Sequence, residues 1–343
     1  MIKLFICSTP YHVLLSHLTV EFLSQDEKIH NTTLILILTE SAISNVVNLI
    51  IDQSIWHKIL ILPYHKTLNL YKTKRFIDNW INDKGLNKLS EKKEIFINDD
   101  KRWRNQLLIT GIKPDGISLI EDGIGAYIRS FYHLRERIYR GLILKSIFRS
   151  RLINIGTISS LHADRFFAFR NTAYSWFGPH RKLHLLEYKN SGYIEKISQK
   201  SFIKNQKEKI DSTNLLILTS PLVEENFLSI KDECNAWKKL GLYLPYSETV
   251  VIKPHPRENE FLFKQRLNVI AEVFKKSRIV KVDSMLPAEI LLCNDDIQAE
   301  IFSPNSTTLA NLKSIRPDLK IYHGYDLFFS NKITKNSMKK AAI

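Results

Sequence analysis

The sequence predicts an α/β protein with two Rossmann-like domains that face a central cleft. Short runs of β-branched and aliphatic residues alternate with longer amphipathic stretches, which is typical of parallel βαβ units. The alternation occurs twice along the 343 residues, and at roughly 150 residues per domain this length corresponds to about two domains. The runs 34–38 and 215–218 are apolar throughout, as strands buried on both faces of a parallel sheet are.

The expected elements fall into two series. In the first half, strands are expected at Lys3–Cys7, Thr33–Leu38, Lys58–Leu62, Glu94–Asn98 and Gly116–Ile120. In the second half, they are expected at Asn214–Thr219, Thr249–Lys253, Arg278–Val282, Ala299–Phe302 and Lys320–His323. Helical patterns between them include Tyr11–Leu23, Phe76–Asp83, Phe261–Lys275 and Ser306–Ser314.

Residues 190–211 separate the two series and are polar and rich in lysine, so we interpret them as a linker. The domains are therefore expected at 1–190 and 212–330, with a basic tail at 331–343. Two Rossmann-like halves joined near the middle are typical of the GT-B layout. In open α/β sheets, ligands bind beyond the carboxyl ends of the strands, so the strand-to-helix turns are where chemistry is expected.

Composition limits the class of protein and of partner. Hydrophobic residues make up 44% and charged residues 25% of the chain, which excludes disordered and fibrous proteins. The 50 Lys and Arg residues exceed the 35 Asp and Glu residues and give a net charge of +15. This balance favours a polyanionic partner: nucleic acid, an anionic lipid surface or a phosphate-bearing substrate.

The cysteines and the apolar runs indicate the compartment. The residues Cys7, Cys234 and Cys293 lie far apart and form no CxxC pair, which argues against a disulfide framework and a zinc finger and favours a reducing cytoplasm. No run approaches the ~18 apolar residues of a membrane span. The polar segment 8–12 interrupts the apolar start before a signal peptide can form. A soluble cytoplasmic protein is expected.

The turn after the first strand reads Cys7-Ser8-Thr9-Pro10-Tyr11-His12. Thr9 is suited to cap the following helix, with Pro10 at its first position. Such a turn presents backbone N–H groups to an anionic or hydroxyl-rich ligand. A plain helix start is the alternative interpretation.

A second turn, Glu121-Asp122-Gly123, brings two adjacent carboxylates to a strand's carboxyl end. When two carboxyl groups lie close together, their pKa values can move apart, so that one stays ionised and serves as a base. The alternative is an acidic turn that caps a helix N-terminus. The similar turns 98–100 and 294–296 have no glycine after them and are interpreted as structural.

The sharpest local signal is His255, held between Pro254 and Pro256 at the end of an apolar strand. Each proline fixes its own φ and restricts the residue before it, so the imidazole has a defined place at the mouth of the sheet. With Lys253 and Arg257 on either side, the histidine is suited to contact a phosphate, or to protonate a leaving phosphate near neutral pH. A rigid loop with a structural histidine is the alternative.

A fourth turn places hydroxyls at another strand-to-helix junction, with Ser303 at the strand end and Ser306, Thr307 and Thr308 at the helix start. Free N–H groups and hydroxyls there can cradle a phosphate. Residues 129–151 interleave arginines with aromatic and aliphatic residues, which fits either a helix on an anionic membrane or a packed surface helix.

No P-loop, HExxH or GxSxG motif occurs, and no DxD lies beside a strand of the first half. P-loop hydrolysis, zincin and α/β-hydrolase chemistry, and metal-dependent GT-A transfer therefore lose support.

Taken together, these motifs resemble those of the bacterial sialyltransferases of glycosyltransferase family 52 and the related bacterial polysialyltransferases. That group has a D/E-D/E-G motif in its first domain, and an HP motif and a paired-hydroxyl motif in its second. Here Glu121-Asp122-Gly123, His255-Pro256 and Ser306-Thr307 match them in order and spacing. The opening turn Ser8-Thr9-Pro10-Tyr11 is also similar, and the resemblance extends from residue 7 to about residue 310.

The resemblance implies an inverting transfer from CMP-sialic acid without metal or other cofactor. His255 would bind or protonate the CMP phosphate. The other donor-binding residues would be Lys253, Pro256, Ser303, Ser306 and Thr307 of the second, donor domain. The acceptor-binding residues would be Ser8, Thr9 and Tyr11 of the first, acceptor domain.

The base that deprotonates the acceptor hydroxyl would be Glu121 or Asp122, with Glu224 and Glu225 as alternatives because family 52 members are thought to use an acidic residue upstream of the HP motif. The expected partners are a nucleotide-sugar donor and a glycan or glycolipid acceptor of lipooligosaccharide or capsule type, with terminal galactose. The protein is expected in the cytoplasm, bound peripherally to the anionic inner face of the membrane. No nucleic-acid partner is expected.

Two other functions stay open. One is a GT-B transferase with another CMP- or CDP-activated donor, such as a Kdo-like sugar or glycerophosphate. The other is a non-catalytic basic protein that binds RNA or lipid, which predicts steep salt dependence and indifference to loss of His255.

Overall fold

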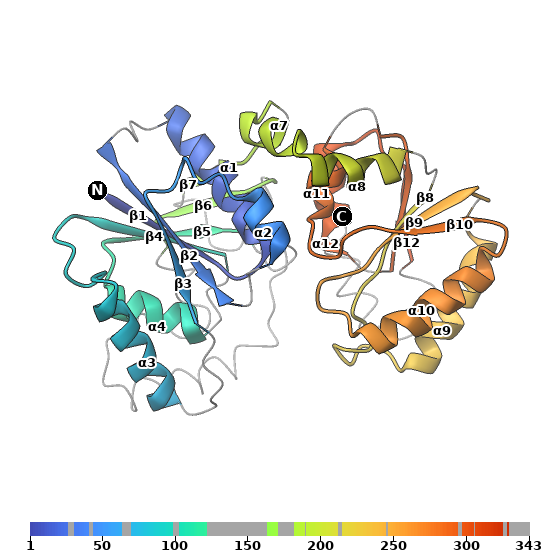
Figure 1. The fold of residues 1–343 in the computed structure, drawn as a ribbon, viewed down its shortest axis with the longest axis horizontal. Helices are drawn as coiled ribbons and strands as arrows, with labels where there is room; N and C mark the ends of the chain where they lie inside the picture. Colours follow the sequence, from blue (N-terminus) through green and yellow to red (C-terminus); the bar gives the residue numbers. More distant parts are fainter. Residues whose placement is uncertain are drawn as a thin grey trace. The chain divides into compact units, whose positions relative to one another are not determined.

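The computed structural model divides into two compact units, residues 1–187 and 188–343. Figure 1 shows the chain from its N-terminus in blue to its C-terminus in red. The structure describes residues 1–26, 31–40, 44–63, 70–98, 103–121, 163–170, 182–188, 190–211, 215–244, 246–293, 297–304, 306–324 and 328.

The first unit alternates strands and helices. Its elements are β1 (Ile2–Cys7), α1 (Pro10–Asp26), β2 (Thr33–Thr39), α2 (Asn45–Ile50), β3 (Lys58–Leu62), α3 (Leu70–Asp83), β4 (Lys93–Ile97), α4 (Trp103–Ile112), β5 (Gly116–Ile120), β6 (Arg165–Ala168) and β7 (Lys182–Leu185). The strands pair in the order β3-β2-β1-β4-β5-β6-β7, and every pair is parallel. Chain order reverses between β1 and β4, the kind of switch point where open α/β sheets bind ligands.

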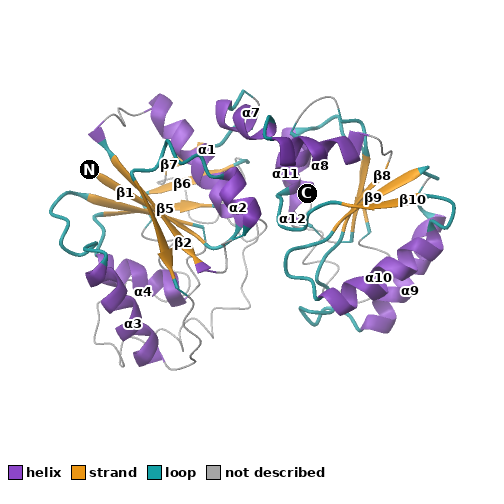
Figure 2. Cartoon of the chain, in the orientation of Figure 1, coloured by secondary structure: helices purple, strands orange, loops and turns teal. Residues whose placement is uncertain are grey.

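Helices cover both faces of this sheet, which is why its central strands are apolar on both sides. Within the unit, α3 and α4 lie against one face and α1 and α2 against the other (Figure 2). Ile6 and Ile97 belong to the core that α3 and α4 close, together with Trp80. On the other face, Phe5 stacks on Phe96 with 4.3 Å between ring centroids.

The second unit follows the same plan with a smaller sheet. Its elements are α7 (Gly192–Ser198), α8 (Ser201–Asp211), β8 (Leu215–Leu218), α9 (Ile230–Lys239), η6 (Leu240–Leu242), β9 (Thr249–Lys253), α10 (Glu260–Val273), β10 (Arg278–Lys281), α11 (Ala288–Leu292), β11 (Glu300–Ser303), α12 (Thr307–Ile315) and β12 (Ile321–His323). The strand order is β10-β9-β8-β11-β12, again parallel throughout. The core between this sheet and α9 and α10 is centred on Trp237, which is fully buried.

The interpretation of residues 190–211 as a linker is wrong. This segment forms α7 and α8, which belong to the second unit. The reason is the spacing of its apolar residues, since Ile194, Ile197, Ile203 and Ile210 recur on a helical period and are all buried. The lysines that suggested a linker lie between them, and even Lys207 is buried, with its ammonium donating to the Ser198 hydroxyl at 2.9 Å.

The predicted strands are confirmed, and two basic segments lie outside the described residues. Each strand predicted from the sequence is present within a residue or two of its predicted bounds. The short strands β6 and β7 were not predicted. The basic stretch 129–151 and the tail 331–343 lie outside the described residues. None of the described helices has both the length and the hydrophobicity that crossing a bilayer requires.

Candidate functional site

The turn after β9 carries His255 and is held by its own backbone. Glu258 N–H donates to the His255 carbonyl oxygen at 3.1 Å, which closes a tight turn over residues 255–258. Lys253 and Pro254 are buried, whereas Pro256 is exposed at the tip. The turn therefore presents its histidine at the carboxyl edge of the second sheet, one strand from the switch point between β8 and β11.

The His255 ring is fixed as a neutral imidazole. Arg257 N–H donates to His255 Nδ1 at 3.2 Å, so Nδ1 carries no proton and the ring proton sits on Nε2. Burial lowers the pKa of His255 to about 3, and the charges of Arg257 and Lys253 act in the same direction. At neutral pH the unliganded turn thus offers an Nε2–H donor rather than an imidazolium.

Lys253 lies beneath this turn and not on its surface. Its ammonium donates to the carbonyl oxygens of Ser284 at 3.1 Å and Pro254 at 3.4 Å. Burial lowers the pKa of Lys253 to about 8, while nearby carboxylates, Glu289 first among them, oppose the fall. The lysine is positively charged near neutral pH and contributes positive potential close to His255.

The hydroxyl turn lies at the same edge of the sheet, after β11. Ser303 is fully buried, and its hydroxyl has no hydrogen-bond partner among the described residues. Ser306 caps α12 by accepting from Thr308 N–H at 3.2 Å. Thr307 is the first residue of α12, and its side chain lies outside what the structure describes. This helix start lies at the same edge of the sheet as the turn over residues 255–258, here called the HP turn. It suits an anion, because the first N–H groups of a helix have no partner within the helix.

Glu289 interacts with residues next to both turns: electrostatically with Lys253, and by hydrogen bonds with α12. It is buried on α11, and Asn311 of α12 donates to its carboxylate at 3.4 Å. Burial raises the pKa of Glu289, and hydrogen bonds, including one from the Thr308 side chain, only partly offset this. The predicted donor-binding residues Lys253, Ser303 and Ser306 therefore lie at the same edge of the second sheet as His255, at the ends of β9 and β11.

In the first unit, Glu121 follows β5 and is fully buried. Its Oε1 accepts from the Tyr11 hydroxyl at 3.1 Å, and its Oε2 accepts from Phe169 N–H at 2.9 Å. The structure thus brings together a predicted base and a predicted acceptor-binding residue, at the edge next to the switch point between β1 and β4. Asp122 lies outside the described residues.

The opening turn caps α1 as the sequence predicts. Thr9 Oγ1 accepts from His12 N–H at 3.2 Å, and the helix begins at Pro10. Ser8 N–H donates to His12 Nδ1 at 3.2 Å. These two N–H groups are already occupied, so the Tyr11 hydroxyl is the turn's polar group that reaches Glu121.

The two alternative bases are engaged in ion pairs. Both Glu224 oxygens accept from the Arg266 guanidinium, at 3.0 and 2.7 Å. Burial alone would raise the pKa of Glu224, but hydrogen bonds from Arg266 and from Asn259 N–H lower it overall. Glu225 pairs with Arg257 at 2.7 Å on the surface. A strongly paired carboxylate with a lowered pKa is a weak base.

Sequence reasoning did not assign several polar residues that the structure places beside these turns. Asn98 was interpreted as structural, yet it is buried after β4 and its Nδ2 donates to the Glu121 carbonyl oxygen at 3.4 Å. Thr219 and Glu258 hold the HP turn, and Arg266 lies behind it. The signal available for Asn98 was its position at a strand's carboxyl end. Among the residues described, no group of three or more His, Cys, Asp or Glu is arranged to hold a metal ion.

Comparisons with solved structures agree on the fold. One similar structure is a Listeria monocytogenes protein assigned as a UDP-N-acetylglucosamine 2-epimerase (TM-score 0.60, 12% identity, covering 100% of this chain and 90% of that chain). Another is the UDP-GlcNAc 2-epimerase from Neisseria meningitidis bound to UDP-GlcNAc (TM-score 0.55, 15% identity, 99% and 94%). A third is the enzyme from Methanocaldococcus jannaschii (TM-score 0.54, 13% identity, 99% and 91%). At these identities the likeness shows the fold alone, and it confirms the predicted GT-B fold of two Rossmann-like domains.

The family is shown by sequence. No curated protein matches the chain. Residues 3–325, however, match the family model described as alpha-2,8-polysialyltransferase (POLYST). This match includes Tyr11, Glu121, His255 and Ser306, and it confirms the predicted resemblance to bacterial sialyltransferases. The chain belongs to the alpha-2,8-polysialyltransferase family and is a sialyltransferase-type glycosyltransferase.

Proposed function

We propose that the enzyme transfers sialic acid from CMP-sialic acid to a glycan acceptor, with inversion and without a metal ion. The observation that carries this proposal is the His255 turn. It offers a neutral imidazole with its proton on Nε2, beside a buried cationic lysine and the N-terminus of a helix. These are the groups that a departing phosphate needs if no metal neutralises it.

On the donor side, the bond between the sialic acid anomeric carbon and the CMP phosphate breaks, and CMP leaves with the bonding electrons. His255 Nε2–H donates a hydrogen bond to a phosphate oxygen as negative charge develops there. The N–H groups at the start of α12 and the Ser306–Thr307 hydroxyls take the remaining oxygens. The positive potential of Lys253 supports the same charge from below.

On the acceptor side, a carboxylate of the first unit removes the proton from the acceptor hydroxyl, whose oxygen bonds to the anomeric carbon from the opposite face. Glu121 and Asp122 are the candidates. Glu224 is disfavoured because both of its oxygens pair with the positively charged Arg266, which lowers its pKa. Tyr11 donates to Glu121 Oε1, and this hydrogen bond positions the Glu121 carboxylate.

We propose a surface glycan of capsule or lipooligosaccharide type, with terminal galactose, as the acceptor. A donor such as CMP-Kdo or a CDP-activated glycerophosphate would use the same phosphate groups, so the donor assay must include these compounds.

We also propose that the enzyme works at an anionic membrane surface, where lipid-linked acceptors reside. Support comes from the end of the second unit that carries the N-terminal ends of β9 and β10. There Leu242, Tyr243 and Tyr246 are exposed, and the Tyr246 hydroxyl donates to the Lys276 carbonyl oxygen at 3.5 Å. The exposed lysines around this membrane patch are Lys238, Lys239, Lys275 and Lys276. Apolar and aromatic side chains among lysines suit a negatively charged bilayer.

The test is turnover of CMP-sialic acid by the purified full chain with EDTA present, using lactose and terminal-galactose acceptors. Wild type and His255→Ala are compared, and CMP-Kdo and CDP-glycerol are offered in parallel. We expect CMP release that is insensitive to EDTA and falls by about 100-fold or more in the variant. If the enzyme turns over CMP-Kdo or CDP-glycerol but not CMP-sialic acid, the proposed donor is wrong. If EDTA abolishes the activity, the metal-independent mechanism is wrong.

A further inference from the structure

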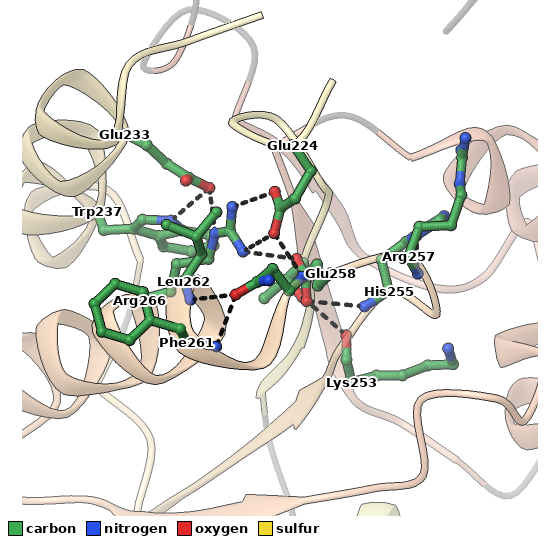
Figure 3. A network of polar contacts seen from close by, with 12 residues as sticks. Glu224, Glu233, Trp237, Lys253, His255, Arg257, Glu258, Phe261, Leu262 and Arg266 are labelled. Carbon is green, nitrogen blue, oxygen red and sulfur yellow. Dashed lines mark hydrogen bonds and ion pairs between the residues drawn. The ribbon is translucent and has the colours of Figure 1, made fainter. Parts of the chain in front are cut away.

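A buried arginine lies behind the HP turn and connects it to the rest of the second unit. Arg266 of α10 is fully buried, and its Nε donates to Glu233 Oε1 of α9 at 2.7 Å. Its Nη1 and Nη2 donate to the two oxygens of Glu224, in the turn after β8. Figure 3 shows Glu224, Glu233 and Glu258 arranged around the guanidinium.

Glu258 connects this arginine to the histidine. Its Oε2 accepts from His255 N–H at 3.1 Å and from the Thr219 hydroxyl at 2.7 Å. Its Oε1 lies 3.8 Å from Arg266 Nη1 and has no hydrogen-bond partner in the described part of the chain. A single carboxylate thus joins the HP turn to the end of β8 and to the arginine.

The turn after β8, which carries Glu224, is also hydrogen-bonded to the start of α10. Glu224 Oε1 also accepts from Asn259 N–H at 2.9 Å, at the residue that caps α10. Thr219 N–H donates to the Lys253 carbonyl oxygen at 3.1 Å, so β8 and β9 stay paired up to the start of the HP turn. Among the described residues, the His255 N–H donates to the Glu258 carboxylate and the His255 carbonyl oxygen accepts from Glu258 N–H, so both of these hydrogen bonds depend on Glu258.

Charge alone does not explain the arrangement. One guanidinium faces three carboxylates, and replacing such a buried polar cluster with apolar residues is often neutral or stabilising. Burial raises the pKa of Glu258 to about 7, which means that folding keeps this carboxyl where its charge is unfavourable. A residue held at such a cost beside a reactive turn is a candidate for function.

We propose that Glu258 is a positioning residue for the transfer reaction: backed by Arg266, it fixes the His255 backbone so that Nε2–H points at the donor phosphate. The inference rests on the proposed function, since it assumes that His255 meets the CMP phosphate. Glu258 touches neither substrate, and its effect passes through the orientation of the imidazole.

The experiment measures kcat and KM for CMP-sialic acid together with the 15N chemical shifts of His255, in the full chain. Glu258→Ala removes the acceptor for His255 N–H. We expect kcat to fall about tenfold or more and the His255 ring to populate both tautomers. Glu258→Gln keeps a carbonyl oxygen for both donors and should restore kcat to within about threefold of wild type.

Two control variants separate positioning from loss of stability. Glu260→Gln changes an exposed glutamate on the same helix, which pairs with Lys264, and should leave kcat unchanged. Ile270→Val removes one methyl group from the buried face of α10 and lowers the melting temperature without touching the turn. Thr219→Val serves as a second probe of Glu258 if Glu258→Ala does not fold, and should lower kcat in the same direction.

The outcomes are distinguishable. If wild type and Glu260→Gln turn over no CMP-sialic acid, the proposed function fails. If wild type is active and Glu258→Ala and Thr219→Val match it in kcat and in the His255 spectrum, the positioning role is overturned. If Ile270→Val loses as much kcat as Glu258→Ala at the same loss of melting temperature, the role is structural only.

Discussion

Tyr11 and Glu121 are 110 residues apart in the sequence, and the Tyr11 hydroxyl donates to Glu121 Oε1 at 3.1 Å. The bond joins the first turn of α1, the helix that follows β1, to the end of β5 across the intervening strand β4. Asn98, at the end of β4, also donates to the Glu121 carbonyl oxygen. Residues from the start of α1 and from the end of β4 thus meet at Glu121, at the edge of the sheet where α/β proteins bind their ligands.

Tyr11→Phe should slow transfer without weakening CMP binding. The substitution removes a hydrogen bond to a carboxylate, which corresponds to a loss of about ten- to 100-fold in kcat if Glu121 must be held in place. CMP affinity should stay unchanged, because the proposed phosphate groups belong to the second unit. Steady-state kinetics and calorimetry with CMP measure both. Tyr71→Phe, an exposed tyrosine on α3 of the same unit, is the matched control; equal kinetics in the two variants would contradict the role of Tyr11.

Glu258→Gln should make stability less dependent on pH. The pKa of Glu258 is raised by burial from 4.5 to about 7 in the folded protein, so the folded state binds more protons than the unfolded chain between these values. The wild type therefore loses stability as the pH rises from about 5 to 7, and the uncharged glutamine does not. The free energy of unfolding of the variant, relative to wild type, should rise by on the order of 1–3 kcal/mol between pH 5 and 8.

Urea unfolding at several pH values measures this difference. Arg266, Glu224 and His255 surround the carboxyl and titrate little in this window, since Arg266 stays charged, Glu224 has a lowered pKa and His255 stays neutral. Glu233, also buried against Arg266, has a raised pKa, and Glu233→Gln provides the comparison. A difference between Glu258→Gln and wild type that is flat across pH 5–8 would show that Glu258 is ionised throughout.

The sequence predicted those parts of the molecule that depend on local pattern. Continuous apolar runs identify β2 and β8, and proline and glycine mark the turns that carry His255 and Glu121. Strand β7, Lys182–Leu185, is short and lies at the sheet edge, so it lacks the apolar run that would predict it. Two partners of Arg266, Glu233 and Glu224, are 33 and 42 residues away in sequence. No local pattern encodes such pairs, because tertiary packing alone brings them together.

Glu94→Gln should destabilise the first unit, and the loss should shrink in acid. Glu94 Oε1 and Oε2 accept from Arg165 at 2.7 and 2.6 Å, and Lys3 donates to Oε2 at 3.0 Å. Burial raises the pKa of Glu94, but the hydrogen bonds from Arg165 and Ser118 and the charge of Lys3 lower it overall. Stability from this carboxylate is therefore complete above pH 4.5 and is lost as the pH falls through the lowered value.

At pH 7 we expect a cost of about 3 kcal/mol, because Arg165 and the buried Lys3 lose their counter-charge. Chemical denaturation at pH 7 and pH 3 gives the two values, with a smaller gap in acid. Glu91→Gln is the control, since Glu91 pairs with the N-terminus at an exposed site and should change stability by less than about 1 kcal/mol. An equal loss at both pH values would show that Glu94 acts through packing and not through its charge.

Serine substitutions in the membrane patch should weaken binding to anionic vesicles. Leu242 is 83% exposed, Tyr243 64% and Tyr246 66%, so replacing them removes little packing from the folded unit. Their apolar area and the surrounding lysines act together at an anionic bilayer, where each lysine contributes about 1 kcal/mol. The triple variant should therefore bind phosphatidylglycerol vesicles at least about tenfold more weakly than wild type in a flotation assay.

Phe261→Ser is the matched control, because Phe261 is 68% exposed at the other end of α10. Wild type should also bind neutral phosphatidylcholine vesicles weakly and lose affinity as salt increases. Equal binding of the triple variant and wild type would place membrane attachment elsewhere on the chain, and equal binding to neutral and anionic vesicles would remove the role of the lysines.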